Sequence, residues 1–272
     1  MTDRITRKVI IDTDPSADDA VALMLAMVSP ELEILGMTAA FGVCDSARSI
    51  KNILKIQTLC GREEIPAVQG AEMPLVRRME FDDAYCGCDG LSQTGLPDPA
   101  KKEEPGEAWR FMAETVKRFP GQVSIISLAP MTNLALMIQN DPAAALAAAG
   151  IYTIAGSYGL RPDYENLNPR PEWNLAQDPE AAAVFGSGIP IPVAGLDVTR
   201  RLDNSMMDRL LARAGENEKT KFLRRAVQFN LDHGLEPYSL LVDSAAVCLA
   251  LCPEIAKTVS GHVIVETRGE YT

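Results

Sequence analysis

The amino-acid sequence predicts an α/β fold in which a mostly parallel, open sheet carries helices on both faces. Short apolar runs typical of buried strands alternate along the chain with longer runs that have the apolar spacing of helices. The chain has 272 residues, which is enough to bury a sizeable core, and no linker or internal repeat divides it. We therefore expect one domain that spans residues 1–272.

The first third of the chain contains two strand-and-helix pairs. An apolar run predicts a strand over Val9–Ile11, and the run after it predicts a helix over Asp18–Met27, with acids in its first turn where they complement the helix dipole. The second pair is a strand over Leu32–Phe41 and a helix over Ala47–Cys60. Strands that alternate with helices in this way are typical of a parallel sheet.

The rest of the chain continues this alternation and contains two long polar segments. The predicted elements are a helix over Gly106–Phe119, a strand over Val123–Leu128, a helix over Thr132–Asn140, a strand over Ile151–Ala155, a helix over Pro179–Phe185 and a strand over Ile191–Val193. The segments Arg77–Pro105 and Tyr158–Pro171 are rich in Gly, Pro, Asp and Asn and are predicted to be loops. Loops of this length in a compact domain often form the walls of an active site.

Composition excludes several classes of partner. The chain has 26 Lys and Arg against 37 Asp and Glu, a net charge of −11, which argues against nucleic acid or an anionic membrane as a partner. No apolar run approaches the ~18 residues that span a bilayer. The start of the chain has no signal-peptide pattern, and six Cys with two His form no convincing zinc pattern. We therefore expect a cytoplasmic protein.

Four carboxylates follow the first predicted strand within eight residues: Asp12, Asp14, Asp18 and Asp19. Ligands of parallel sheets bind at the carboxyl ends of the strands, so these acids are predicted to lie at a binding edge. Carboxylates packed this closely repel one another unless a cation lies among them, and their hard oxygens suit Ca²⁺ or Mg²⁺. A solvated acidic turn is the alternative, but these acids adjoin an apolar strand rather than a polar linker.

The two adjacent acids are expected to act differently. Neighbouring residues of a helix point about 100° apart, so Asp18 and Asp19 cannot both have one role. One can bind the cation while the other faces a group such as a sugar hydroxyl. Pro15 keeps Asp14 extended and holds the turn open.

Four blocks of sequence, in the same order along the chain, resemble the calcium-dependent nucleoside hydrolases of the inosine–uridine type. The blocks are Asp12-Thr13-Asp14-Pro15-x-x-Asp18-Asp19-Ala20, Ser127–Ala135, Asn166–Asn174 with Gln177–Ala182 after it, and Asp243–Ala246. The resemblance implies hydrolysis of the N-glycosidic bond of ribonucleosides to ribose and free base. It also implies the family's single α/β domain, Ca²⁺ as cofactor, a role in nucleoside metabolism and a homo-oligomer, either a dimer or a tetramer.

The resemblance implies a role for each matching metal-site residue. Asp14 matches the Ca²⁺ ligand that also acts as general base for a Ca²⁺-bound water, and Asp19 and Asp243 match two further ligands. Leu128 matches the position whose backbone carbonyl completes the protein ligands. Asp12 is expected to support the other acids without binding the metal itself. Without the resemblance, Asp243 would be interpreted as the cap of a helix.

A second set of residues matches the positions that bind the substrate. Asp18, Asn166, Glu172 and Asn174 match residues that hold ribose hydroxyls. Trp173 lies between two of them and is expected to line the pocket and stack on a base. The alternatives are that Asn166, Glu172 and Asn174 only form turns and that Trp173 is only a large apolar residue.

The chain departs from the family pattern mainly where the nucleobase would lie. Val43 replaces an Asn, Val242 replaces a His that precedes the C-terminal Asp, and Cys86 or its neighbour replaces a second His. A degenerate member that binds Ca²⁺ and ribosides with little or no turnover is therefore an alternative. His233 is a candidate for the missing acid, although its place before Gly234 is typical of a helix end.

Ser16 stands where the family commonly has Gly, so an unusual backbone angle there is either strained or relaxed. The final run Val263–Thr272 resembles a hairpin that family members continue, so either the chain is a short member or it lacks a tail. A phosphohydrolase of the haloacid-dehalogenase type fits Asp12-x-Asp14 only superficially, because Asp18 and Asp19 follow at once and no catalytic Lys element is recognisable.

Overall fold

The computed structural model describes residues 6–79, 81, 83–158, 172–235 and 239–267. Its centre is a six-stranded sheet in the order β3-β2-β1-β4-β5-β6, and every neighbouring pair is parallel. The strands are β1 (Arg7–Thr13), β2 (Leu32–Ala39), β3 (Ala67–Gln69), β4 (Val123–Ser127), β5 (Gly150–Ile154) and β6 (Val193–Ala194). The predicted α/β fold with a parallel sheet is confirmed.

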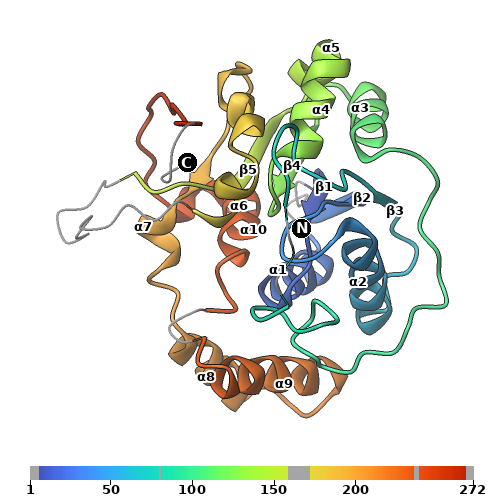
Figure 1. Ribbon diagram of the computed structural model, residues 1–272, viewed down its shortest axis with the longest axis vertical. Coiled ribbons are helices and arrows are strands. Elements are labelled where there is room, and N and C mark those ends of the chain that lie inside the picture. The colour runs from blue at the N-terminus through green and yellow to red at the C-terminus, as the bar shows by residue number, and fades with distance from the viewer. Residues whose placement is uncertain (1–5, 80, 82, 159–171, 236–238, 268–272) are drawn as a thin grey trace, which may run out of the picture.

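Helices cover both faces of this sheet (Figure 1). In the described part of the chain they are α1 (Ala17–Val28), α2 (Ser46–Cys60), α3 (Ala108–Arg118), α4 (Thr132–Asn140), α5 (Pro142–Leu146), α6 (Trp173–Gln177), α7 (Leu196–Thr199), α8 (Asn204–Arg213), α9 (Glu218–Asp232) and α10 (Ser244–Leu251). Two 3-10 helices, η1 (Pro179–Gly186) and η2 (Pro253–Ile255), accompany them. No helix in these ranges is long and apolar enough to cross a membrane.

Alternate residues of the strands face two separate cores, because successive strand side chains point to opposite faces. Val9 and Ile11 pack with apolar residues of α1, α2 and α10, whereas Ile10 between them packs with residues of α3, α4, α5 and η1. All three side chains are fully buried. A strand buried on both faces must be apolar throughout, and this explains the unbroken run that predicted β1.

The sheet has a topological switch point between β1 and β4. The chain proceeds from β1 to β2 and β3 on one side, and from β4 to β5 and β6 on the other. The two strands end side by side, because the Leu128 backbone N donates to the Asp12 backbone O at 2.8 Å. A crevice outside the carboxyl ends of the strands at such a point is where open α/β sheets bind ligands. Asp14 and Leu128 thus flank the expected binding position.

Several predicted elements needed correction. The strand predicted over Leu32–Phe41 ends at Ala39, and the strand predicted over Ile191–Val193 is the two-residue β6. The helix predicted over Pro179–Phe185 is the 3-10 helix η1, whose start is fixed by Asp178. The Asp178 carboxylate accepts from Thr132 Oγ1 at 2.6 Å and from the backbone N of Leu75 and of Ala181, which ties this turn to α4 and to the loop after β3.

The terminal hairpin is not present in the described residues. From residue 256 to residue 267 the structure shows no strand, and the Ile264 side chain is 93% exposed. No described segment pairs with this run, so its β-branched residues have no sheet to join. The described part of the run Val263–Thr272 therefore forms no strand, and residues 268–272 lie outside the described part of the chain.

Candidate functional site

Three carboxylates from distant parts of the chain meet beside the end of β1. One oxygen from each of Asp18, Asp19 and Asp243 lies within 4.8 Å of the others, and all three residues are buried. Asp18 and Asp19 belong to the first turn of α1, whereas Asp243 precedes α10, which packs against α1. Packing of these two helices therefore brings Asp243 to the acids of the N-terminal motif.

Asp14 lies at the carboxyl end of β1 and is held by the loop after β2. Its Oδ2 accepts a hydrogen bond from the Val43 backbone N at 2.8 Å, and the side chain is buried. A Cβ on Gly42 would lie 1.8 Å from the same oxygen, so only glycine leaves room for this carboxylate. The importance of Gly42 could not be predicted from the sequence, because no local pattern indicates that a residue 28 positions after Asp14 contacts it.

The other acids of the motif are held by hydroxyl and backbone donors. Asp19 Oδ1 accepts from Thr13 Oγ1 at 2.5 Å, and its Oδ2 accepts from the Ser16 backbone N at 3.1 Å. The Ser16 hydroxyl donates to Asp18. Ser16 has φ −101°, which is an ordinary extended angle, so its presence at the family's glycine position causes no backbone strain. These bonds fix two carboxylates side by side.

Asp12 lies one layer behind the cavity. Its Oδ1 accepts from Thr38 Oγ1 at 2.7 Å and from Asn133 Nδ2 at 2.9 Å, while its Oδ2 has no hydrogen-bond partner in the described part of the chain. Burial raises the pKa of Asp12 to about 7, although the two hydrogen bonds lower it. The Asn133 amide also contacts the backbone of Ala39 and Ala71, so Asp12 connects the ends of β1 and β2 to α4.

The electrostatics of these acids fit a divalent cation. Burial raises the pKa of Asp14 and of Asp243 well above the usual range, and the negative charges of the neighbouring acids raise both further. Burial and the Asp18 charge raise the pKa of Asp19 to about 7. Among the described residues, no Lys or Arg forms an ion pair with Asp14, Asp19 or Asp243. A hard cation with several oxygen ligands would neutralise such a group.

The short helix α6 brings a second group to the same place. The Glu172 carboxylate caps this helix by accepting from the backbone N of Asn174 at 2.9 Å and of Leu175 at 3.1 Å. Burial raises the pKa of Glu172, although these hydrogen bonds lower it. Asn174 Nδ2 donates to the Leu128 backbone O at 2.8 Å, so the side chain and the carbonyl predicted to bind ribose and metal are in contact. Asn166 lies outside the described residues.

A cavity of about 860 Å³ connects the two groups. The predicted residues that line it are Asp14, Asp18, Asp19, Leu128, Glu172, Trp173, Asn174 and Asp243. Trp173 is partly exposed and makes an edge-to-face contact with Tyr85, at 5.6 Å between ring centroids. Tyr85, Cys86 and Ser92 come from the predicted loop Arg77–Pro105, part of which therefore forms a wall of the cavity, as expected.

The three departures from the family pattern also line this cavity, namely Val43, Cys86 and Val242. Cys86 Sγ lies 3.5 Å from the Val43 backbone O, and burial raises the pKa of this thiol to about 12. His233 does not line the cavity; its Nδ1 lies 2.8 Å from the Phe229 backbone O and its ring stacks on Phe229. The helix-end interpretation of His233 is therefore the better one.

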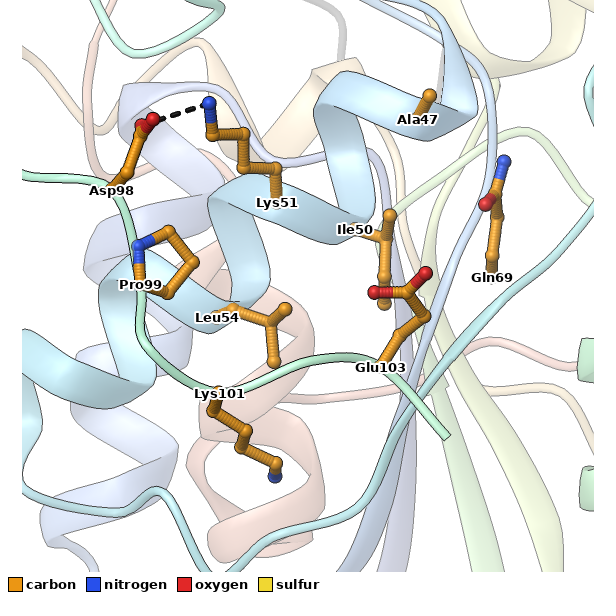
Figure 2. Close-up of a pocket in the computed structure, with 9 residues that line it drawn as sticks. All are labelled: Ala47, Ile50, Lys51, Leu54, Gln69, Asp98, Pro99, Lys101 and Glu103. Atoms are coloured by element: carbon orange, nitrogen blue, oxygen red, sulfur yellow. Dashed lines mark ion pairs between the residues drawn. The ribbon is translucent and has the colours of Figure 1, made fainter. Parts of the chain in front are cut away.

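A second, smaller hollow has a different character (Figure 2). It has a volume of about 330 Å³ and lies between α2 and the loop at residues 98–103. Two of its charged side chains pair with each other, since Lys51 Nζ is 2.8 Å from Asp98 Oδ1 (Figure 2). None of the predicted site residues lies there, so the larger cavity is the candidate site.

Known proteins of similar sequence and structure match this chain over most of its length. The chain is 37% identical to the pyrimidine-specific ribonucleoside hydrolase RihA of Salmonella agona (strain SL483) over 97% of this chain and 86% of that protein. The structure matches a plant nucleoside hydrolase, PpNRh1, with a TM-score of 0.88 at 31% identity over 97% of this chain and 85% of that one.

A purine-preferring ribonucleoside hydrolase from Gardnerella vaginalis is also similar, with a TM-score of 0.86 at 27% identity over 97% of this chain and 86% of that one. Residues 9–272 match the sequence pattern of one family over nearly the whole chain. The resemblance seen in the four sequence blocks is thereby confirmed, and this chain belongs to the inosine-uridine preferring nucleoside hydrolase family.

Proposed function

We propose that this chain hydrolyses the N-glycosidic bond of ribonucleosides to ribose and free base with Ca²⁺ as its cofactor. Ribonucleoside hydrolysis is the activity of its family and of its relatives. The observation that carries the rest is the group of buried carboxylates in a cavity at the switch point of the sheet. Among the described residues, no Lys or Arg forms an ion pair with Asp14, Asp19 or Asp243, which supports a metal rather than a structural role.

The proposed metal ligands are the carboxylates of Asp14, Asp19 and Asp243 and the backbone carbonyl of Leu128. Asp18 belongs to the same cluster, so its carboxylate is close enough to serve either the metal or a ribose hydroxyl. Four oxygen donors, three of them charged, suit Ca²⁺, which accepts six to eight oxygens in flexible geometry. Bound there, Ca²⁺ would lower the pKa of an adjacent water and help to hold ribose hydroxyls.

Asp14 is the proposed general base. Its carboxylate is fixed by the Val43 backbone N and lies at the mouth of the crevice between β1 and β4. It would take one proton from the water that attacks the anomeric carbon. Burial raises the pKa of this carboxyl in the metal-free protein, and bound Ca²⁺ would lower it, so Asp14 would be ionised and able to accept the proton.

The ribose would be held by Asp18, Glu172, Asn174 and Asn166, with Trp173 at the entrance. Glu172 and Asn174 are fixed on α6 by their own hydrogen bonds, so they would orient the sugar with little loss of entropy. Positive charge develops on the ribose as the glycosidic bond breaks, and the surrounding carboxylates stabilise it.

The base preference is an open part of this proposal. Similar proteins are named as pyrimidine-specific and as purine-preferring, and the base side of this cavity has its own residues. A neutral thiol and two valines supply no acid near neutral pH, which is the observation that favours the alternative of weak turnover.

We also propose that the chain forms a homo-oligomer, a dimer or a tetramer, as its resemblance to the family implies. Size-exclusion chromatography with light scattering would test this. A mass of two or four chains is expected, and a monomer at micromolar concentration would contradict it.

The activity is tested with a panel of purine and pyrimidine ribonucleosides and an assay for free ribose. Wild-type protein should release ribose with Ca²⁺ and lose this activity with chelator. Asp14→Asn should abolish release, whereas the exposed matched change Asp208→Asn should leave it unchanged. Ribose release that survives both chelator and Asp14→Asn would contradict the proposal. No release from any nucleoside, with Ca²⁺ still bound, would favour the alternative.

A further inference from the structure

Asn230 has an unusual position in the cavity wall. It belongs to α9, only 3% of its surface is exposed, and it is one of the residues that line the cavity. Its side-chain Nδ2 has no hydrogen-bond partner among the described residues. A buried amide donor without an acceptor is unfavourable, so an unpartnered one that borders a binding cavity points to a ligand atom.

The contacts of α9 place the end of this helix, and Asn230 with it, beside the loop that carries Cys86. Arg225 Nη1 donates to the Thr94 backbone O at 2.7 Å, and a Cβ on Gly87 would lie 3.5 Å from the Phe229 ring. The end of α9 therefore packs beside the loop that carries Cys86 and Ser92. In Figure 1, α9 lies at the opposite end of the molecule from α3, α4 and α5.

Apolar side chains line the same cavity as Asn230, among them Leu235, Leu240 and Val242, together with the polar residues Thr199, Arg200 and Ser239. The Asn230 backbone O accepts from the Leu235 N at 2.9 Å, which closes the end of α9 and fixes the backbone at this position. A fixed amide in a cavity wall is well suited to recognise one polar atom of a ligand.

We infer that Asn230 donates a hydrogen bond from Nδ2 to an acceptor atom of the nucleobase, either a carbonyl oxygen or an unprotonated ring nitrogen. This inference rests on the proposed function. Because the sugar is expected at the acids and at α6, the base must extend toward the remaining wall, where Val43, Cys86 and Val242 offer no side-chain donor that is charged near neutral pH.

The same hydrogen bond would assist departure of the base. When the bond between the anomeric carbon and the base nitrogen breaks, both of its electrons go to the base, and the water oxygen bonds to the carbon. One water proton goes to Asp14, and the base takes up a proton from solvent. A hydrogen bond to the base strengthens as negative charge develops there, so Asn230 would stabilise the transition state more than the bound substrate.

The test compares two kinds of leaving group. Uridine and inosine have bases with acceptor atoms and need charge stabilisation, whereas p-nitrophenyl β-D-ribofuranoside releases a stable phenolate that does not. Asn230→Leu removes the donor with little change in size, and Asn230→Asp replaces it with an acceptor. The control Gln228→Glu makes the same amide-to-carboxylate change at an exposed position of the same helix, where the amide donates to Asp232 Oδ1 on the surface.

We expect Asn230→Leu to lower kcat/KM by about 10- to 100-fold for the preferred nucleoside, mainly in kcat, and by less than about threefold for the nitrophenyl riboside. Asn230→Asp should lose at least as much on the nucleoside, and Gln228→Glu should change neither substrate. Thermal melting of each variant shows whether it is folded.

Equal losses on both substrates by Asn230→Leu would overturn the inference, because they would indicate a structural role. Unchanged nucleoside hydrolysis would overturn it as well. If Asn230→Leu does not fold, Asn230→Asp decides by the same ratio of the two substrates. Wild-type protein that is inactive on every substrate would instead overturn the proposed function, and the inference would fall with it.

Discussion

The two sides of the cavity are built in opposite ways. On the acid side, Asp14 and Asp19 are buried and Glu172 is half-buried, and each carboxylate is held by hydrogen bonds from backbone amides or hydroxyl groups. On the base side, Val43 and Val242 are apolar, and the thiol of Cys86 is neutral. Cleavage of a glycosidic bond creates positive charge on the sugar and negative charge on the base. In this chain the carboxylates lie on the side where the sugar is expected.

This difference between the two sides indicates where the site tolerates substitutions. In the proposed site the acids act as one group around a cation, so the loss of one member would leave the others unbalanced. A base can instead leave with help from a neutral hydrogen-bond donor, and the rate then depends on how acidic the departing base is. We therefore expect substitutions on the acid side to be far more damaging than those on the base side.

The largest effect should come from removal of an acid that joins the two ends of the chain. Asp243→Asn should lower ribose release by about 10³-fold, because it weakens both cation binding and charge stabilisation. Without Ca²⁺ the same variant should melt at a higher temperature than the wild type, because one buried negative charge is gone. Ribose assays and thermal melts check both results. A loss of less than about tenfold would contradict the proposed role of this residue.

A smaller effect is expected from Gly42→Ala, which keeps every acid but displaces one. The new Cβ would collide with Asp14 Oδ2, and a shift of about 1 Å in a catalytic group costs about 10²-fold in rate. Gly215→Ala is the control, because a Cβ there meets nothing within 4 Å. Steady-state kinetics would show the loss in kcat. Full activity of Gly42→Ala would mean that the position of Asp14 is not critical.

The acid side should also make metal-free protein sensitive to pH. The folded pKa values of Asp12 and Asp19 are raised from 3.8 to about 7, so between these values the folded state binds more protons than the unfolded state. Stability of the metal-free protein therefore falls as the pH rises through this range. Ca²⁺ should raise the melting temperature more at pH 8 than at pH 5.5, with a difference on the order of 5 °C.

Scanning fluorimetry of metal-depleted protein, with and without added Ca²⁺, measures this difference. Metal-depleted protein that is more stable at pH 8 than at pH 5.5 would show that the buried acids do not repel one another.

The smallest effect is expected on the base side. Cys86→Ser should change kcat/KM by less than about threefold and leave its pH profile unaltered between about pH 6 and 9, because the thiol with a pKa of about 12 is neutral throughout. A pH-rate profile for both proteins tests this. If one limb of the pH-rate profile disappears in the variant, Cys86 is the leaving-group acid. The base side would then contribute an ionisable group to the reaction.

Much of the fold could be predicted because its signals are local. Strands β1, β4 and β5 lie close to their predicted limits, since each is an apolar run bounded by polar residues. The two-residue β6 and the 3-10 helix η1 depend on what packs against them. The predicted terminal hairpin is absent from residues 263–267, which pair with no described strand, and residues 268–272 lie outside the described part of the chain.

The candidate site could be predicted only in part, for a similar reason. Asp14, Asp18 and Asp19 lie within six residues of one another and follow a strand, so their own pattern indicates a metal site. Asp243 joined them only through the resemblance, because it comes from the other end of the chain. Gly42 and Asn230 carry no local signal, since their importance arises from tertiary contacts. The roles of the site residues, the single domain and the oligomeric state stay predictions.

The central claim is that the acids hold one Ca²⁺ on which ribonucleoside hydrolysis depends. The most direct test titrates metal-depleted protein with Ca²⁺, while calorimetry records binding and the ribose assay records rate on matched samples. The account predicts one site per chain and a rate proportional to its occupancy. Hydrolysis that proceeds at full rate without Ca²⁺, or a filled site with no hydrolysis of any nucleoside, would contradict it.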